Sequence, residues 1–277
     1  KGVVWLFHGT GGNANGWINS FENRDFLNTC MADGFAVVVT ECEETTKGAD
    51  LNNDGKIRWS PFPVDSVANV DYANIRAIRD TFVHRGWMSA ATPQFAVGMS
   101  NGGSFSVTFG AAMRWKGVVS YCAPGANVIA NTTLTPTMWC MAKYDNNENV
   151  GPQGNADALA QHQIMLGRGI CTRYFLHDRA PVFAERFERR GDISTAQALA
   201  VFQDLQANNC LDPESFLNIS GDSIGQLVIA SPLNWPGIAA LTSLQRGFVR
   251  EQLSVSFADH QFFGDFNGRT LDFLNHA

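Results

Sequence analysis

The chain has few charged residues and no long apolar run. Charged residues make up 17% of its 277 residues, with 20 Lys and Arg scattered among 26 Asp and Glu. Because no basic cluster is present, the sequence argues against nucleic acid or an anionic membrane surface as a partner. No segment approaches the ~20 apolar residues that a membrane span requires. Hydrophobic residues still make up 45% of the chain, so we expect one large or two small domains with a sizeable core.

The six cysteines do not form a metal-binding pattern. They contain no C-x-x-C pair and lie near no histidines at zinc-finger spacing, which argues against structural zinc. An even number of cysteines fits up to three disulfides and an oxidising compartment, and the alternative is that several are buried thiols. The pairs that we favour are Cys30 with Cys42, Cys122 with Cys140, and Cys171 with Cys210. No signal peptide is visible in the sequence, which opens inside a strand-like run. The expectation of a secreted or periplasmic location is therefore inferred from the cysteines and not from a targeting segment.

The first part of the chain alternates strand-like and helical segments. Short apolar runs predict strands at residues 2–7, 35–40, 94–98, 117–122, 137–142 and 172–176. Helical patterns lie between them, at residues 69–85, 103–113 and 157–167. This order predicts an α/β fold with a mostly parallel central sheet of about six strands flanked by helices.

The texture of the sequence changes near residue 180. Helical patterns at residues 194–208 and 241–251 are separated by less regular sequence. We expect an α/β core over residues 1–179, a helical cap or lid inserted over 180–256, and a return to the core over 257–277. The insertion is long enough to roof a cleft.

A G-x-S-x-G motif, Gly98-Met99-Ser100-Asn101-Gly102, follows the strand at 94–98 and opens a helix. A serine hydroxyl is a weak nucleophile, so it must project from a sharp turn where a base can reach it. Glycines on both sides allow the strand and the helix to pass close together. The motif therefore predicts Ser100 as a nucleophile and the Asn101 N–H as an oxyanion donor, against the alternative of an ordinary glycine-rich turn.

A second glycine-rich loop, His8-Gly9-Thr10-Gly11-Gly12, follows the first strand. An oxyanion hole needs a second N–H donor, which usually comes from the loop after an earlier strand, and we assign it to Thr10. No G-K-[ST] sequence follows, so a phosphate-binding loop is excluded. We expect His8 to be a structural hydrogen-bonding residue of this loop.

Together these two motifs resemble the α/β-hydrolase superfamily, and more narrowly secreted esterases of the polyhydroxybutyrate depolymerase and feruloyl esterase type. The resemblance covers the sheet to about residue 177 and the segment around His260, but not the insertion. It implies a serine carboxylic-ester hydrolase with a Ser-His-Asp triad, acting on small-molecule or polymeric esters, including polyester or aromatic ones. It implies no required cofactor, and we expect a monomer. The alternatives are a serine peptidase or amidase on the same fold and a non-catalytic binding protein.

The family order of Ser, acid and His assigns the remaining two catalytic residues. Asp145 lies just beyond the strand at 137–142, and Glu148 and Asp178 are the alternative acids. His260 precedes the last predicted helix, where the family places its base. His177 ends a predicted strand and is the alternative base. The resemblance therefore implies a triad of Ser100, Asp145 and His260.

The segment at residues 50–57 matches the start of an EF-hand calcium loop, with Asp50, Asn52 and Asp54 at ligand positions. Pro61 stands where such a loop needs its final bidentate Glu, and no flanking helices are evident. An Asx- and Gly-rich turn is the favoured interpretation, with weak calcium binding as the alternative. Trp59 and Trp17 are candidate substrate-binding side chains, for which core packing is an equally good account.

Overall fold

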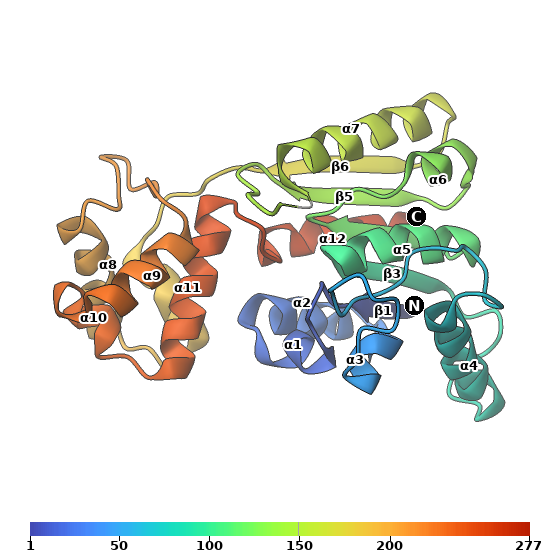
Figure 1. The fold of residues 1–277 in the computed structure, drawn as a ribbon, viewed down its shortest axis with the longest axis horizontal. Helices are drawn as coiled ribbons and strands as arrows, with labels where there is room; N and C mark the ends of the chain where they lie inside the picture. Colours follow the sequence, from blue (N-terminus) through green and yellow to red (C-terminus); the bar gives the residue numbers. More distant parts are fainter. Residues whose placement is uncertain (149) are drawn as a thin grey trace. The chain divides into compact units, whose positions relative to one another are not determined.

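The structure is a computed structural model that describes residues 1–148 and 150–277 (Figure 1). Six strands form one sheet in the order β2-β1-β3-β4-β5-β6. The strands are β1 (Val3–Phe7), β2 (Ala36–Thr40), β3 (Gln94–Met99), β4 (Gly117–Tyr121), β5 (Thr137–Ala142) and β6 (Thr172–His177). All six predicted strands are therefore confirmed, each within one residue of its expected ends.

Neighbouring strands run in the same direction. Trp5 of β1 is in register with Val38 of β2 on one side and with Ala96 of β3 on the other. The pairs β3–β4 and β4–β5 are also parallel. A parallel sheet gathers the carboxyl ends of its strands at one edge, which is where open α/β folds bind their ligands. The loops that follow β1 and β3 both start at this edge.

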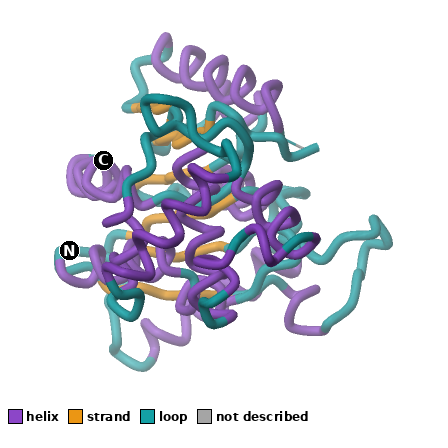
Figure 2. The backbone as a smooth tube through the Cα atoms, turned by 90° about the vertical axis from the view of Figure 1, so that its left-hand side faces the viewer, coloured by secondary structure: helices purple, strands orange, loops and turns teal. Residues whose placement is uncertain are grey.

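Helices cover both faces of the sheet (Figure 2). Since side chains alternate along a strand, Trp5 and Phe7 face one layer and their neighbours face the other. The first layer contains α4 (Val70–His84), α5 (Asn101–Ala112), α6 (Asn127–Thr132) and α7 (Gly151–Gly167), which pack on core clusters that include Trp5, Phe7 and Trp139. The second face is lined by residues of α2 (Phe21–Ala32) and α12 (Asn267–His276), and the hydroxyl of Tyr121 in β4 lies 2.7 Å from that of Thr270. Short helices α1 (Ala14–Asn19) and α3 (Glu43–Lys47) follow β1 and β2, and η3 (Gly264–Phe266) precedes α12.

The apolar composition of the strands follows from their burial. Every residue of β1, β4 and β5 is buried, as are all residues of β3 except Met99. The edge strands β2 and β6 are largely half-exposed. Strands that are covered on both faces need apolar side chains at every position, whereas edge strands do not.

The chain divides into two compact units. Unit 1 comprises Lys1–Met141, Glu148–Leu176 and Phe262–Ala277, and unit 2 comprises Ala142–Asn147 and His177–Gln261. Unit 2 contains η1 (Ala184–Arg190), α8 (Thr195–Ala207), α9 (Gly221–Ala230), η2 (Pro232–Asn234), α10 (Pro236–Ala239) and α11 (Ser243–Phe257). Capping boxes at Ser194 and Thr242 begin α8 and α11, where the sequence predicts helices. The boundaries of 180 and 256 and the role of a lid stay predictions.

The disulfide expectation is corrected by the structure: all six cysteines lie within the described residues, and none of them forms a disulfide. Cys140 is in register with Tyr121, whereas Cys122 follows the end of β4 with a φ of 50°. The Cys42 sulfur accepts a hydrogen bond from the Thr45 N–H at the start of α3. Burial raises the pKa of Cys30 to about 12, so its inert thiol behaves as part of the core. The alternative interpretation, that the cysteines are buried thiols, holds for five of the six, and Cys171 is exposed.

Within the described residues, the structure contains no helix of the length and apolarity that crossing a membrane demands.

The buried strands give a direct test of the core. Leu6 of β1 is fully buried and Leu134 is 77% exposed, and both belong to unit 1. We expect Leu6→Ala to lower the free energy of unfolding by about 2–5 kcal/mol, because it leaves a cavity between sheet and helices. The same truncation at Leu134 is expected to change it by less than about 0.5 kcal/mol. Urea denaturation of both variants measures the difference, and equal effects would contradict the assignment of this core.

Candidate active site

Ser100 lies in the turn between β3 and α5, in a strained backbone conformation. Its φ of 58° and ψ of −128° are outside the regions that residues with a side chain ordinarily adopt. The Ser100 N–H donates a 2.8 Å hydrogen bond to the carbonyl of Tyr121 at the end of β4, which holds the turn against the sheet. Strain of this kind persists only where the surroundings impose it, and it is typical of functional positions.

Two glycines make the turn possible because three backbones meet there. A Cβ on Gly98 would lie 2.1 Å from the carbonyl oxygen of Gly102, the second residue of α5. A Cβ on Gly102 would lie 2.2 Å from the carbonyl oxygen of Phe7, the last residue of β1. These distances are far below van der Waals contact, so the G-x-S-x-G glycines are required by packing.

The loop after β1 lies against Ser100. A Cβ on Gly9 would be 3.2 Å from the Ser100 Cβ, so this loop and the serine turn touch. His8 is buried, with its Nδ1 2.8 Å from the Gly9 carbonyl oxygen and its Nε2 accepting from the Cys42 N–H. This arrangement fits a neutral ring with its proton on Nδ1, and burial lowers the pKa of His8. His8 therefore acts as the structural hydrogen-bonding residue that the sequence predicts.

The two predicted oxyanion donors lie on the loops that meet at Ser100. Asn101 is the first residue of α5, and the amide of a first helical residue has no partner inside its own helix. Thr10 is exposed and directly follows Gly9 in the touching loop. The structure thus brings Thr10, Ser100 and Asn101 to one end of the sheet within unit 1.

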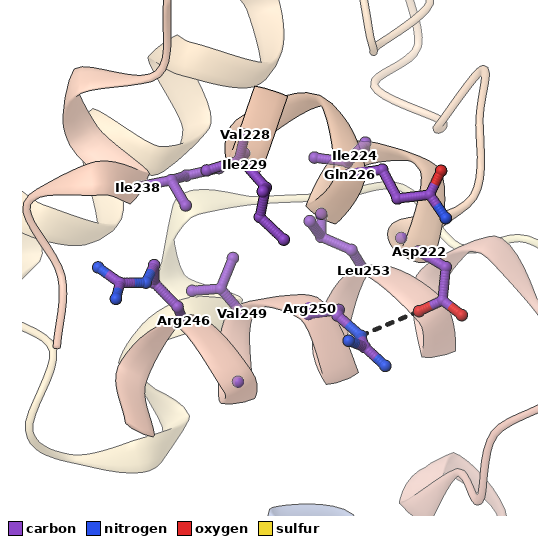
Figure 3. Close-up of a pocket in the computed structure, with 13 residues that line it drawn as sticks. Asp222, Ile224, Gln226, Val228, Ile229, Ile238, Arg246, Val249, Arg250 and Leu253 are labelled. Atoms are coloured by element: carbon purple, nitrogen blue, oxygen red, sulfur yellow. Dashed lines mark ion pairs between the residues drawn. The ribbon is translucent and has the colours of Figure 1, made fainter. Parts of the chain in front are cut away.

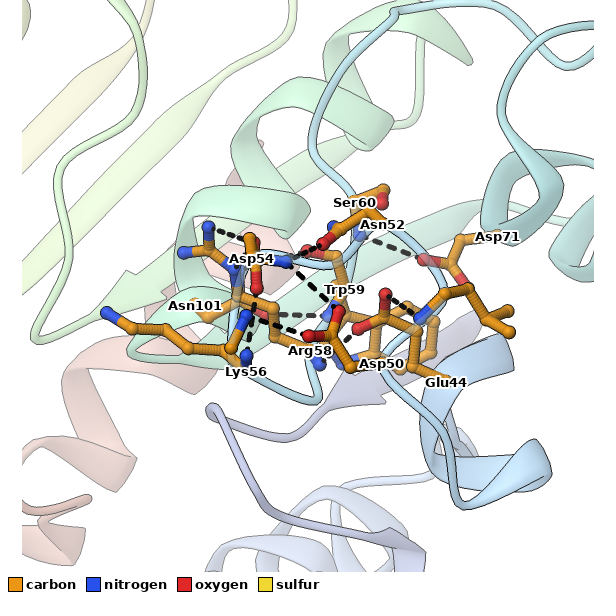
Figure 4. Close-up of polar contacts among 12 residues, drawn as sticks. Glu44, Asp50, Asn52, Asp54, Lys56, Arg58, Trp59, Ser60, Asp71 and Asn101 are labelled. Carbon is orange, nitrogen blue, oxygen red and sulfur yellow. Dashed lines mark hydrogen bonds and ion pairs between the residues drawn. The ribbon is translucent and has the colours of Figure 1, made fainter.

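The segment at residues 57–59 is hydrogen-bonded to both of these loops, and Figure 4 shows its contact with Asn101. The Asn101 side chain accepts a 2.8 Å hydrogen bond from the Trp59 N–H and donates a 3.1 Å bond to the Trp59 carbonyl. Two residues earlier, the carbonyl of Ile57 accepts a 2.8 Å hydrogen bond from the Gly11 N–H. No sequence pattern indicated that the Asn101 side chain holds this segment.

Two buried carboxylates accept hydrogen bonds from both ends of a longer segment, residues 51–60, which includes residues 57–59. Glu44 accepts hydrogen bonds from the N–H groups of Leu51 and Arg58, at 3.1 and 2.9 Å. Asp71 accepts from the N–H groups of Glu43 and Ser60, at 2.8 and 2.9 Å, and burial raises its pKa. Residues 51 to 60 are therefore fixed at both ends by side chains from α3 and α4.

The predicted calcium loop forms an Asx-rich turn. Asp50 accepts a 2.7 Å hydrogen bond from the Gly55 N–H, and Asn52 accepts one of 2.9 Å from the Asp54 N–H. Asp54 forms an ion pair with Arg58 at 2.6 Å, and the guanidinium lowers the pKa of Asp54. These hydrogen bonds agree with the favoured interpretation of the segment as an Asx- and Gly-rich turn. Calcium binding at this turn stays a prediction.

The expectation that Trp59 and Trp17 bind substrate is corrected, since each side chain is only 1% exposed. Trp59 stacks on Phe105 with ring centroids 4.7 Å apart. Trp17 packs edge-on against Phe262 at 5.2 Å. Both rings fill the core of unit 1, so the alternative of core packing describes them.

A histidine–carboxylate pair forms within unit 2. The Nδ1 of His260 lies 2.7 Å from Oδ2 of Asp145, whose side chain is fully buried. The other carboxylate oxygen accepts a 2.9 Å hydrogen bond from the Asn147 N–H. Helix α11 ends in a left-handed cap at Ala258, whose carbonyl accepts from the Tyr144 N–H at 3.0 Å. The structure therefore brings together two residues that are 115 positions apart in the sequence.

Asp259 is a buried carboxylate that the sequence analysis missed. It accepts a 2.8 Å hydrogen bond from the His260 N–H and a second one from the Asn146 N–H. It thus holds the residue next to Asp145 and the backbone of His260 at the same time. Burial is the main cause that raises its pKa, with the charges of Asp222 and Asp145 adding to the effect. Its place directly before His260 was the available signal.

The alternative acids and base have other partners. His177 lies with its Nε2 2.9 Å from the Val255 carbonyl oxygen. Asp178 pairs with Lys143 at 2.6 Å, and Glu148 lies 4.0 Å from Lys56. The pair of Asp145 and His260 is therefore favoured over these alternatives. Ser100 belongs to unit 1 and the pair to unit 2, so the triad of all three stays a prediction.

No family model matches the chain, and no curated protein matches it in sequence. Solved structures do resemble it. One is an uncharacterised protein from Bacillus cereus (7% identity, 65% of this chain, 55% of that chain, TM-score 0.45). Others are Est1E from Butyrivibrio proteoclasticus with ferulic acid bound (11% identity, 64% and 79% covered, TM-score 0.43) and a Bacillus cereus carboxylesterase (16% identity, 64% and 78% covered, TM-score 0.39).

These likenesses are too distant to indicate a shared activity, so the fold assignment rests on the chain itself. Six parallel strands between two helical layers, with a strained serine between β3 and α5, form an α/β-hydrolase fold.

The buried carboxyl of Asp259 predicts a pH effect on stability. Because the folded-state pKa of Asp259 is raised, the stability that it contributes is fully present below its unfolded value of about 3.9. That contribution is lost as the pH rises through the folded pKa. We expect Asp259→Asn, which does not titrate, to gain stability relative to the wild type as the pH rises above about 4. Urea denaturation at each pH measures the difference, and a difference that is independent of pH would contradict the prediction.

Proposed function

We propose that the protein is a serine hydrolase that cleaves carboxylic esters through an acyl-enzyme on Ser100. The observation that carries the proposal is the turn at Ser100. Ser100 has a strained backbone with a φ of 58°, and Gly9 of the loop after β1 lies in contact with it. The proposed amide donors belong to this loop and to the start of α5. A nucleophile turn requires a strained serine, glycines that let the backbones approach closely, and the amide of a first helical residue next to the serine. A structural serine needs none of them.

In the proposed reaction, His260 Nε2 accepts the Ser100 hydroxyl proton while Oγ attacks the ester carbonyl. The amides of Thr10 and Asn101 stabilise the oxyanion of the tetrahedral intermediate. Collapse of the intermediate breaks the bond to the alkoxy group, which leaves as an alcohol with the proton from His260. Water then attacks the acyl-enzyme with His260 as base, which releases the carboxylic acid and restores Ser100.

Asp145 supports His260 as the base. A 2.7 Å bond from Nδ1 to a buried carboxylate fixes the tautomer that leaves Nε2 as the acceptor. The pairing of His260 with Ser100 is part of the proposal, and the chain order of serine, acid and histidine supports it.

The proposed chemistry uses only side chains and backbone amides of this chain, so we propose that no cofactor is required. The substrate is an ester, and the same scaffold and triad chemistry serve amidases and peptidases. Parallel assays with p-nitrophenyl esters and p-nitroanilides separate these classes.

Replacing the nucleophile tests the reaction directly. We expect Ser100→Ala to lower kcat for p-nitrophenyl acetate by roughly 10³-fold or more, because no acyl-enzyme can form. A fluorophosphonate probe is expected to label the wild type at Ser100 and to leave the variant unlabelled. Retention of wild-type hydrolysis by Ser100→Ala would refute the mechanism, and a wild type with neither labelling nor hydrolysis would favour a binding protein.

Two histidine variants identify the base. We expect His260→Ala to lower kcat by roughly 10³-fold or more, since Ser100 loses its proton acceptor. His177→Ala is the matched control, because His177 is a buried histidine of the same unit, and it is expected to retain the kcat of the fraction that folds. Active-site titration and circular dichroism correct for unfolding. The opposite pattern would move the base to His177 and leave the role of Ser100 intact.

A further inference from the structure

Unit 2 contains a cavity of about 430 Å³ between α9, α10 and α11. Figure 3 shows side chains of α9 and α11 facing one another across it. A volume of this size is typical of small-molecule sites. All residues that line it belong to unit 2, and none of them is a candidate catalytic residue.

The walls of the cavity are aliphatic, and its described lining includes no aromatic side chain. They are formed by Ile224, Val228, Ile229, Ile238, Val249 and Leu253. Five of these side chains are buried, but Ile229 is 83% exposed although it lines the cavity. The cavity is therefore open to the surface at Ile229, where a ligand can enter.

The cavity exists because α9 and α11 touch at one end and separate at the other. A Cβ on Gly221 would lie 2.6 Å from the Ser254 backbone nitrogen, so the helices are in contact there. Further along, a Cβ on Gly225 would meet only the Arg250 side chain, at 3.4 Å, and one on Gly247 would have no atom within 4 Å. The space is therefore wedge-shaped and suits a narrow, flexible chain.

The charged residues of the lining give the cavity a net positive charge, since two arginines and one carboxylate contribute to it. Arg246 lies at one end, where it donates to the carbonyls of Ala239 and Leu241. Arg250 pairs with Asp222 at 2.9 Å, with side chains that are 64% and 59% exposed. An ion pair this exposed contributes little stability, so a ligand carboxylate can compete with Asp222 for Arg250.

We propose that this cavity binds an aliphatic monocarboxylate of the fatty-acid class. The alkyl chain lies between α9 and α11 against the aliphatic walls, and the carboxylate binds Arg250. The wedge shape favours a flexible chain over a planar ring, and the net positive charge favours an anion. The site is independent of Ser100 and does not rest on the proposed esterase activity.

Calorimetric titration of the whole protein with decanoate, below its micelle concentration, tests the site. We expect saturable binding with one ligand per chain. Gly247→Leu fills the cavity and is expected to weaken binding by about tenfold or more, and it raises helix propensity. Gly268→Leu is the matched control, because Gly268 lies in α12 and a Cβ there also has no atom within 4 Å. It is expected to bind decanoate as the wild type does.

Two charge variants test the position of the carboxylate with opposite signs. We expect Arg250→Gln to weaken decanoate binding by about two- to fivefold, and Asp222→Asn to tighten it by a similar factor. Binding of 1-decanol is expected to be weaker and unaffected by either change. The site is refuted by the absence of saturable decanoate binding or by equal binding in the two leucine variants. Tighter binding of decanol, or weaker decanoate binding in Asp222→Asn, overturns the carboxylate contact.

Discussion

The close approach of three backbones at the end of β1 and β3 is the constraint on which the candidate site depends. Gly98 and Gly102 allow the first turn of α5 to pass within contact of Phe7, where any side chain would collide. This packing imposes a strained conformation with positive φ on Ser100 and brings Gly9 against it. Ser100 and the loop after β1 are thus positioned together by one steric constraint.

Once the backbones meet, polar side chains fix the two loops that carry the proposed oxyanion donors. Asn101 forms two side-chain hydrogen bonds with Trp59, while Gly11 bonds to Ile57 in the same segment. Motion of either loop is therefore coupled to the segment at residues 51–60. That segment is in turn held by Glu44 and Asp71, whose oxygens replace water as acceptors for buried N–H groups. Oxyanion donors need this rigidity because they must be aimed before charge develops.

Local patterns predicted the sheet and the serine turn, and the family resemblance implied the histidine–carboxylate pair, whereas long-range packing decided what they missed. The strands were recognisable because burial on both faces leaves a continuous apolar run. Trp17 and Trp59 were ambiguous, since a core ring and a substrate platform have the same composition and differ only in what surrounds them. The thiols were misassigned because cysteine number says nothing about which face of the sheet each sulfur occupies. Asp259 was overlooked because its role depends on the Asn146 N–H, over 100 residues away in the sequence.

None of the six cysteines, all of which the structure describes, forms a disulfide, and buried carboxylates hold the loops together instead by accepting backbone hydrogen bonds. Their pKa values determine how the stability of these loops changes in acid. Asp71 and Asp259 each accept two backbone N–H groups and have pKa values raised by burial. A group whose folded pKa is raised takes up its proton readily, so mild acid does not withdraw the stability that it provides. Asp54 and Asp178, paired with exposed cations, have lowered pKa values and lose their contribution as the pH falls. Surface ion pairs should therefore weaken in acid before the buried carboxyls that hold the candidate site.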